Sequence, residues 1–367
     1  MAINRVIISG GGTGGHIFPA ISIADEIKRR NPKSKILFVG AKGKMEMEKV
    51  PLAGYKIKGL PIAGFRRKLS FSNFLLPFKI LKSLLKARKI IKNFKPQLVI
   101  GVGGYASGPT LKMANLMRVP TIIQEQNSFP GKTNRMLAKG ASAICVAYKS
   151  SSNYFPKNKL VLTGNPVRAN IINQTFKKSE AYEHFKLDPN KKTILVIGGS
   201  LGAKSLNLSI KRNLNKLNTP NIQVLWQCGK LYHSPMSREL NHHKNENIFL
   251  HQFISKMDYA YSVADLIVSR AGAISVSELC IIGKPVILVP SPNVTDDHQT
   301  KNALELVENE AAILVKDTEA REKLVDTCID LVNNDKLINK LSSQISTLAI
   351  VDSAKRIVDV CENNAKK

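Results

Sequence analysis

The chain has 367 residues, of which 43% are hydrophobic, and its formal net charge is +28. This length exceeds one typical hydrophobic core, so we expect two domains of ordinary size. Five scattered cysteines without a CxxC spacing argue against a disulfide framework and favour a reducing cytoplasm, and no apolar stretch is long enough to span a bilayer. With no signal segment before the first apolar run, we expect a soluble or peripheral protein.

Positive charge is concentrated in the first half of the chain. Residues 1–179 contain 32 Lys and Arg against 5 Asp and Glu, a balance of +27, whereas residues 180–367 contain 23 against 22, a balance of +1. A lysine-rich composition bias would have affected both halves equally. The first half is therefore expected to attract phosphates, nucleic acid or an anionic membrane surface.

Short apolar runs alternate with helical periodicity along the chain, a rhythm that is typical of buried parallel strands with helices on both faces. The predicted strands form two series, residues 5–9, 35–40, 97–102, 120–123 and 143–147, then 193–197, 222–227, 266–269 and 285–290. The sequence thus predicts an α/β protein with two doubly wound, Rossmann-like domains. A hinge at residues 163–166 separates domains 1–164 and 165–345, and one amphipathic helix over 346–367 could join either domain.

Three glycine-rich turns each follow a predicted strand and precede a helix-like stretch: GGGTGGH at residues 10–16, GVGGYASGP at 101–109 and GGSLGA at 198–203. Glycine lets the backbone approach a ligand, and a helix N-terminus offers unpaired N–H groups to an anion. Three such turns favour a diphosphate substrate.

Two of these turns also match other enzyme classes. Gly10, Gly12 and Gly15 fit the dinucleotide fingerprint, but no acid directly follows the second strand to bind the ribose. The third turn spells GxSxG around Ser200, a hydrolase elbow, with Asp265 or Asp296 and His298 downstream in the required order. A hydrolase would leave the other turns unexplained, so Ser200 is favoured as a hydroxyl donor to phosphate.

Two side chains are candidates for chemistry on a nucleotide sugar. His16 directly follows the last glycine of the first turn, where an imidazole can serve as a general base. Glu278 follows a turn of small residues that can admit a phosphate, and its carboxylate can accept from two ribose hydroxyls. Because the chain has no DxD pair, no metal is expected, and helix dipoles and Arg168 would meet the charge of the leaving diphosphate.

An ordered set of motifs runs nearly end to end: GGGTGGHIFPA, GVGGYASGP, QEQNSFPGKTN, TGNPVR, GGSLGA, SRAGAISVSE and DHQTKNA. Through them the chain resembles the MurG family, bacterial transferases that add N-acetylglucosamine from UDP-N-acetylglucosamine to the lipid-linked muramoyl-pentapeptide precursor of peptidoglycan. The resemblance implies the GT-B arrangement of two domains across a cleft, with the lipid diphosphate on the N-terminal domain and the UDP-sugar on the C-terminal domain. A UDP-sugar epimerase and a diacylglycerol glucosyltransferase, which are other GT-B enzymes, remain alternatives.

The resemblance also implies binding residues. Expected donor contacts are Thr13, Gly14, Gly15, Asn127, Arg168, Ser200, Ile254, Ala273, Ile274, Ser275, Val276, Ser277, Glu278, His298 and Gln299, with the Ile254 backbone meeting the uracil. The acceptor diphosphate is expected at Gly12, Gly103, Gly104, Tyr105 and Ser107. The implied reaction is a single inverting displacement in which the muramoyl 4-hydroxyl attacks the anomeric carbon, a base near His16 takes its proton, and UDP leaves.

A segment without acids, residues 66–95, combines apolar and basic side chains at helical spacing. It predicts contact with an anionic membrane surface, and the resemblance implies that this surface is the cytoplasmic face of the bacterial inner membrane. The residues expected there are Phe74, Leu75, Phe78, Leu81, Lys79 and Lys82. Nucleic acid is not an expected partner, since aromatic residues make up only 6% of the chain and no basic motif is interleaved with stacking rings.

Overall fold

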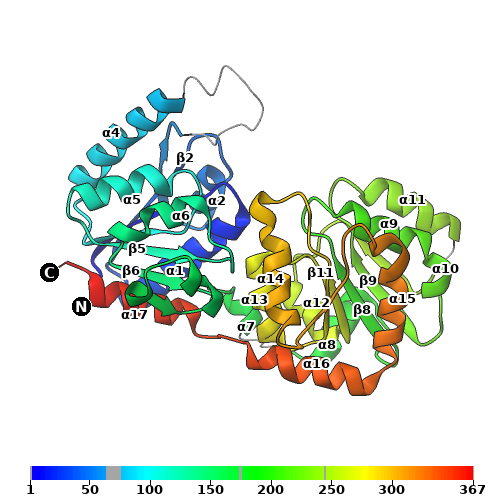
Figure 1. Cartoon of the computed structure of the whole chain (residues 1–367). Coiled ribbons are helices and arrows are strands. Elements are labelled where there is room, and N and C mark those ends of the chain that lie inside the picture. Colours follow the sequence, from blue (N-terminus) through cyan, green and yellow to red (C-terminus); the bar gives the residue numbers. More distant parts are fainter. Residues whose placement is uncertain (1, 63–75, 173–175, 244, 367) are drawn as a thin grey trace. The chain divides into compact units, whose positions relative to one another are not determined.

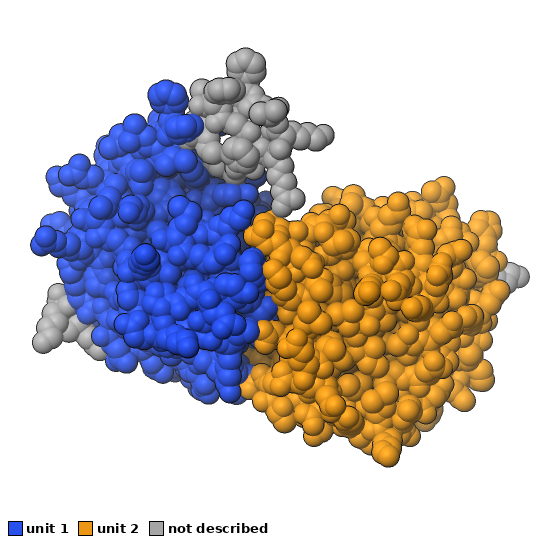
Figure 2. Space-filling view, viewed as in Figure 1, with its two compact units in different colours: residues 1–168, 350–367 blue, residues 169–349 orange. Residues whose placement is uncertain are grey.

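The computed structural model describes residues 2–62, 76–172, 176–243 and 245–366. The chain divides into two compact units, the first formed by Met1–Arg168 with Ile350–Lys367 and the second by Ala169–Ala349 (Figures 1 and 2). Each unit has its own parallel sheet with helices on both faces, and the prediction of two doubly wound α/β domains is confirmed.

The first unit contains a seven-stranded sheet in the order β3-β2-β1-β4-β5-β6-β7. Its strands are β1 Arg5–Ser9, β2 Lys35–Ala41, β3 Lys56–Leu60, β4 Leu98–Gly101, β5 Thr121–Glu125, β6 Ala143–Val146 and β7 Leu160–Leu162. Its main helices are α1 Gly14–Arg30, α2 Glu46–Leu52, α4 Leu76–Phe94, α5 Ser107–Leu116, α6 Lys132–Leu137 and α17 Ser353–Asn364.

Alternate residues of the central strands enter two different cores, which is why these strands read as unbroken apolar runs. Val6 and Ile8 face the core that contains residues of α1 and α17, whereas Ile7 faces the core that contains residues of α4 and α5. The two helix pairs therefore cover opposite faces of the sheet.

The second unit repeats this topology with six strands in the order β10-β9-β8-β11-β12-β13. The strands are β8 Lys192–Ile197, β9 Ile222–Gln227, β10 Ile248–His251, β11 Leu266–Ser269, β12 Val286–Leu288 and β13 Ile313–Leu314. The helices are α7 Ala169–Ile172, α8 Lys178–Phe185, α9 Lys204–Arg212, α10 Leu214–Leu217, α11 His233–His243, α12 Met257–Val263, α13 Ala273–Ile282, α14 His298–Val307, α15 Ala320–Val332 and α16 Asp335–Thr347.

The C-terminal segment differs from the expected single helix over residues 346–367. The chain is still in α16 at Thr347, leaves it, and starts α17 at Ser353. Helix α17 buries Ile357, Val358 and Cys361 in the core of the first unit, and Arg30 of α1 forms ion pairs with Asp359 and Glu362. The prediction of one continuous helix was wrong because the chain must turn between the helix of one unit and the helix of the other.

Candidate active site

In both units, turns with predicted ligand contacts lie where the strand order reverses. The order runs outward in opposite directions from the neighbours β1 and β4, and likewise from β8 and β11. In doubly wound sheets, ligands bind beyond the carboxyl ends of the strands at this switch point. The first two glycine-rich turns follow β1 and β4, whereas the third glycine-rich turn and the turn at residues 270–272 follow β8 and β11.

The two glycine-rich turns of the first unit interlock. A Cβ atom at Gly104 would overlap the carbonyl of Gly11, and a Cβ at Gly11 would overlap the carboxylate of Glu46. Glu46, at the start of α2, is only 1% exposed, and it accepts hydrogen bonds from Gly12 N at 2.8 Å and Ala41 N at 2.9 Å. The glycines therefore make room for a second loop and for an internal carboxylate. The N–H of Gly12 donates its hydrogen bond to that carboxylate, Glu46.

The imidazole of His16 is oriented by the first turn. Its Nδ1 lies 3.0 Å from the carbonyl oxygen of Gly11 and 3.4 Å from the hydroxyl of Thr13. A carbonyl only accepts, so the proton of the neutral ring is assigned to Nδ1, and Nε2 carries the lone pair. A Cβ at Gly103 would lie 2.8 Å from Nε2, which places this basic nitrogen against the second glycine-rich turn.

A second buried carboxylate shapes the loop after β5. Glu125 Oε1 accepts from the backbone N–H of Asn127 at 3.0 Å and from its side-chain amide at 3.2 Å. Glu125 Oε2 accepts from Gly131 N at 3.1 Å and from Asn134 Nδ2 at 2.8 Å. This carboxylate fixes the conformation of the predicted donor contact Asn127. Glu125 is the only acid between residues 49 and 179, and this sequence signal could have identified it.

The other predicted residues of the first unit are spread around these turns. Gly12, Thr13, Gly15 and Tyr105 are exposed, and Gly14 is the first residue of α1. Ser107 is buried, and its hydroxyl donates to the carbonyl of Gly104 at 2.8 Å, so it braces the second turn. Arg168 is the last residue of the first unit before the division.

In the second unit the third glycine-rich turn also meets a neighbouring loop. A Cβ at Gly202 would overlap the carbonyl of Cys228, which follows β9. Ser200 is exposed at the carboxyl end of β8. Asp265 accepts from Thr193 N at 2.7 Å near the start of β8, at the opposite end of that strand, so it cannot serve Ser200 as the acid of a hydrolase triad.

A charged cluster beneath the second unit's turns was not predicted. Arg270 Nη1 binds Asp317 at 2.5 Å and the carbonyl of Val289 at 2.9 Å, and Nη2 donates to Ser205 at 3.0 Å. Ser205 also donates to Asp317. The cluster joins the starts of α9 and α13 to the end of β12, so it stabilises the loops around the switch point.

Glu278 lies on α13, in the helix that follows the turn at β11. It is 5% exposed, and its Oε2 accepts from the hydroxyl of Tyr261 on α12 at 3.2 Å. Glu278 is therefore not an ordinary solvated acid on the outer face of a helix. Ala273, Ile274 and Ser275 form the first turn of the same helix, where Gly272 is the N-cap without a side-chain cap. Val276 is buried, and Ser277 donates to the carbonyl of Ala273 at 3.1 Å.

Three further predicted donor contacts already take part in hydrogen bonds between backbone and side chain. The N–H of Ile254 donates to Gln227 Oε1 at 2.8 Å, so its carbonyl is the backbone group that a base could meet. Gln299 Oε1 accepts from Ser291 N at 2.8 Å, and His298 Nδ1 lies 2.7 Å from the carbonyl of Thr295. Both side chains stand at the start of α14.

The part of the chain that the structure describes contains no group of three or more His, Cys, Asp or Glu side chains arranged to hold a metal ion. None of the helices in that part is both long and apolar enough to cross a membrane. All five cysteines are buried, and burial raises the pKa of Cys228 to about 11.

Comparisons with known proteins agree with this geometry. The glycosyltransferase family 28 N-terminal domain matches residues 6–146, and the C-terminal domain of the same family matches residues 193–357. A relative from Parabacteroides distasonis is 55% identical over 97% of this chain and 96% of its own length. The chain belongs to the MurG family of glycosyltransferases.

Other members of the MurG family are similarly close. A relative from Flavobacterium psychrophilum is 52% identical over 97% of this chain and 96% of its own length. Both relatives carry the name UDP-N-acetylglucosamine–N-acetylmuramyl-(pentapeptide) pyrophosphoryl-undecaprenol N-acetylglucosamine transferase. The crystal structure of Acinetobacter baumannii MurG is 30% identical with a TM-score of 0.80, and the match covers 98% of this chain and 99% of that one.

A UDP-N-acetylglucosamine 2-epimerase from Neisseria meningitidis has a TM-score of 0.70 at 18% identity, covering 98% of this chain and all of that one. At that identity the likeness shows a shared fold alone.

Proposed function

We propose that this enzyme transfers N-acetylglucosamine from UDP-N-acetylglucosamine to the 4-hydroxyl of undecaprenyl-diphospho-N-acetylmuramoyl-pentapeptide, the step from lipid I to lipid II in peptidoglycan synthesis. The observation that carries the proposal is identity of 50–55% over nearly the whole length of curated transferases with this name. The epimerase alternative rests on fold likeness alone, at 18% identity.

The second unit supplies the donor site. The carbonyl of Ile254 accepts from the uracil, and the Glu278 carboxylate accepts from the ribose hydroxyls. The first turn of α13, together with the exposed Ser200 beside α9, donates to the diphosphate. His298 and Gln299, at the start of α14, contact the sugar. Tyr261 supports this assignment because its hydroxyl holds the Glu278 carboxylate in place.

The first unit supplies the acceptor site and the base. Gly103, Gly104 and the exposed Tyr105 receive the acceptor diphosphate, while Gly12 and Ser107 shape the two turns through their bonds to Glu46 and Gly104. His16 takes the proton of the attacking 4-hydroxyl at Nε2, because Nδ1 already donates to Gly11. The hydrogen bond to the carbonyl of Gly11 keeps the proton on Nδ1 and the lone pair on Nε2.

The displacement inverts the anomeric centre. The new bond forms between the acceptor oxygen and the anomeric carbon while the bond to the UDP oxygen breaks, and the hydroxyl proton passes to His16. UDP leaves with its negative charge balanced by Arg168, Asn127, the helix N-termini and Ser200. Thr13, Gly14 and Gly15, at the start of α1, stabilise charge on the donor side of the reacting centre.

The enzyme meets its lipid-linked acceptor at an anionic membrane surface on the cytoplasmic side. Helix α4 presents Phe78, 72% exposed, and Leu81, 57% exposed, next to Lys79 and Lys82. Apolar side chains at the interface and lysines near anionic lipid reinforce each other. Phe74 and Leu75, which the sequence also assigned to this surface, lie outside the described residues.

A competition between acceptors tests the function. The protein is incubated with radiolabelled UDP-N-acetylglucosamine and either a short-chain lipid-linked muramoyl-pentapeptide or diacylglycerol, and released sugars are separated. We expect label only in the muramoyl product. Label in diacylglycerol, or free N-acetylmannosamine-type products without acceptor, would replace the proposal with one of the two alternatives.

A further inference from the structure

Three buried side-chain amides lie together at the carboxyl end of β5 in the first unit. Gln124, Gln126 and Asn165 are each at most 2% exposed, and none of them is among the site residues predicted from the sequence. Gln124 is on β5, Gln126 directly follows that strand, and Asn165 lies three residues before Arg168. Because buried polar groups in native proteins are hydrogen-bonded, the partners of these amides indicate what they hold in place.

The three residues are bonded to one another in a ring, which we call the amide ring. Gln124 Nε2 donates to Asn165 Oδ1 at 3.0 Å, and Asn165 Nδ2 donates to the backbone carbonyl of Gln126 at 2.9 Å. Gln126 Nε2 completes the ring by donating to Gln124 Oε1. Since each residue both donates and accepts, no side chain of the amide ring can rotate without losing a hydrogen bond.

Gln126 also has a partner outside the amide ring. Its Nε2 donates at 2.9 Å to the carbonyl of Val102, the residue directly after β4 and before Gly103 of the second glycine-rich turn. The backbone pairing of β4 with β5 ends at Gly101 and Ile123, so the Gln126 side chain continues the connection between the two strands by one residue. Val102 is fully buried, and a buried carbonyl needs such a partner.

The bond to Val102 also fixes the direction of the next N–H group. The peptide group between Val102 and Gly103 is planar and trans, so its carbonyl and its N–H point in opposite directions. With the carbonyl held by Gln126, the Gly103 N–H points away from the amide ring. In the part of the chain that the structure describes, no hydrogen bond from this N–H to another residue is found. The group is therefore available to a ligand.

The backbone at Gly103 does not maintain this direction by itself. Gly103 has φ +94°, and a glycine adopts φ of either sign, so the Val102–Gly103 peptide could flip at low cost. A flip would put a carbonyl where the N–H is, and a carbonyl repels an anion. A Cβ at Gly103 would lie 2.8 Å from His16 Nε2, so this peptide group is close to the proposed base.

We propose that Gln126 is a positioning residue of the acceptor site. Its amide prevents the Val102–Gly103 peptide from flipping and so keeps the Gly103 N–H directed at the acceptor diphosphate. Gln124 and Asn165 act one step further away, because they hold Gln126 in place. The proposal rests on the proposed function, which assigns the acceptor diphosphate to this turn.

Steady-state transfer to a short-chain lipid-linked muramoyl-pentapeptide tests the role of Gln126. Gln126→Met keeps the length of the side chain and removes its amide. The matched control is Gln223→Met, since Gln223 on β9 of the second unit is 1% exposed and its Nε2 donates to the carbonyl of Asp188 at 2.7 Å and to Thr193 Oγ1 at 2.9 Å. Both variants lose a buried amide, but only Gln126 contacts a predicted ligand turn.

We expect Gln126→Met to raise the acceptor KM about tenfold or more, with kcat and the UDP dissociation constant nearly unchanged. The reason is that the Gly103 N–H would bind the diphosphate equally in the ground state and the transition state. The control should keep the KM of the parent. An unchanged acceptor KM in Gln126→Met, or an equal rise in the control, would overturn the proposal.

Gln126→Glu tests the hydrogen bond itself, and it replaces the methionine variant if that variant does not fold. Burial raises the pKa of a carboxyl group. A protonated carboxyl can donate to the Val102 carbonyl, whereas an ionised one repels it. The ratio of the acceptor KM in this variant to that in the parent should therefore fall as the pH is lowered. A ratio that does not depend on pH would contradict a role for the donated hydrogen bond.

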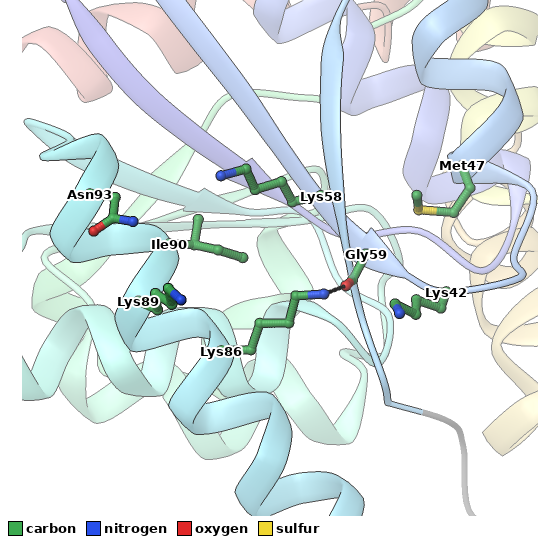
Figure 3. A pocket seen from close by; sticks show the side chains of 8 residues that line it. All are labelled: Lys42, Met47, Lys58, Gly59, Lys86, Lys89, Ile90 and Asn93. Carbon is green, nitrogen blue, oxygen red and sulfur yellow. Dashed lines mark hydrogen bonds between the residues drawn. The ribbon is translucent and has the colours of Figure 1, made fainter.

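Binding of inorganic pyrophosphate provides a measurement that does not depend on transfer. A pocket of about 380 Å³ at the β3 edge of the same sheet can attract this anion as well (Figure 3). The lysines that line it are Lys42, Lys58, Lys86 and Lys89. Calorimetry is therefore carried out with saturating UDP on full chains that carry Lys42→Gln and Lys89→Gln. In that background Gln126→Met should weaken pyrophosphate binding about tenfold, and Gln223→Met should leave it unchanged.

The two measurements distinguish failure of this proposal from failure of the proposed function. Absence of transfer in the parent would contradict the proposed function, and pyrophosphate binding would then decide the role of Gln126 by itself. Equal pyrophosphate affinity with and without Gln126→Met would overturn the proposal even where transfer is observed.

Discussion

The first and second units share one strand order around their switch points, yet they support their ligand loops with different charges. In the first unit, buried carboxylates support the loops: Glu46 accepts from the N–H of Gly12 in the first turn and from the N–H of Ala41 at the end of β2, and Glu125 accepts from the loop of Asn127. In the second unit a guanidinium supports the loops, since Arg270 binds Asp317, Ser205 and the end of β12. The supporting charge is thus internal in both units.

The two parts of the chain also differ in net charge. The residues up to 179 hold nearly all of the net positive charge, and the rest of the chain is close to neutral. A basic unit suits a lipid diphosphate and a membrane, whereas a neutral unit suits a nucleotide bound by dipoles and hydrogen bonds. The contrast teaches that topology places the ligand loops in the same way in both units, while net charge distinguishes one unit from the other.

The largest expected effect is a loss of turnover, and it distinguishes the proposed chemistry in the first unit from the proposed donor binding in the second. His16→Ala should reduce turnover on the order of 10²-fold or more, because the general base is lost, and leave UDP binding nearly intact. Turnover is measured by radiolabel transfer and UDP binding by calorimetry. His242→Ala, an exposed histidine of α11, is the control. Turnover close to that of the parent would reduce His16 to a residue that only orders the first turn.

In the second unit, the expected effect is on donor binding. Glu278→Ala should weaken donor binding by about 1–3 kcal/mol, the cost of losing a charged hydrogen-bond partner. Calorimetric titration with UDP gives the dissociation constant, and Glu308→Ala, an exposed acid after α14, is the control. An unchanged dissociation constant would remove Glu278 from the donor site and leave it as the partner of Tyr261.

Glu46→Gln tests the internal carboxylate of the first unit. One of its two oxygens becomes an amide NH2 group, a donor that faces a backbone N–H donor, so we expect a loss of about 1–2 kcal/mol in stability. Amide hydrogen exchange at Gly12 and Ala41 should be faster, and turnover should fall without a change in UDP binding. Glu48→Gln on the same helix, 71% exposed, is the matched control.

The fluorescence of Trp226, the only tryptophan, reports on the second unit, where it is buried. An unchanged Trp226 spectrum in the Glu46 variant would place the effect in the first unit. Slow exchange at Gly12 in this variant would contradict the bracing role of Glu46.

The smallest effect concerns the membrane. Phe78→Glu with Leu81→Glu should reduce sedimentation with anionic vesicles at low salt several-fold, because each substitution removes apolar contact and adds repulsion. The control pair Leu52→Glu and Leu231→Glu removes exposed leucines elsewhere, one from each unit. Equal sedimentation of both double variants would place the membrane contact on another part of the basic surface.

The central strands could be predicted from the sequence, and the edge strands could not. The strands that the apolar pattern did not reveal are β3, β7, β10 and β13, and each lies at an edge of its sheet. A central strand is buried on both faces and reads as an apolar run, whereas Lys56 and Lys58 of β3 are exposed. Charged residues on edge strands also prevent unwanted pairing, which hides such strands from a hydrophobic pattern.

Only those parts of the candidate site that are formed by residues close together in the sequence could be predicted. Glycine-rich turns after strands identified the loops, but Glu46 and Arg270 act through partners distant in the chain, such as Gly12 and Asp317. No spacing rule connects such residues. The sequence interpretation therefore assigned the glycines to phosphate alone, whereas some of them also make room for a neighbouring loop and a carboxylate.

Transfer with EDTA present tests the central claim most directly. Radiolabelled UDP-N-acetylglucosamine and a short-chain lipid-linked muramoyl-pentapeptide are incubated with the protein in EDTA, and the linkage of the product is determined by NMR. The account predicts a product with a β-linkage to the 4-hydroxyl, formed at the same rate as without EDTA, because helix termini and side chains balance the charge of UDP. An α-linked product, or transfer that appears only with added Mg²⁺ or Mn²⁺, would contradict it.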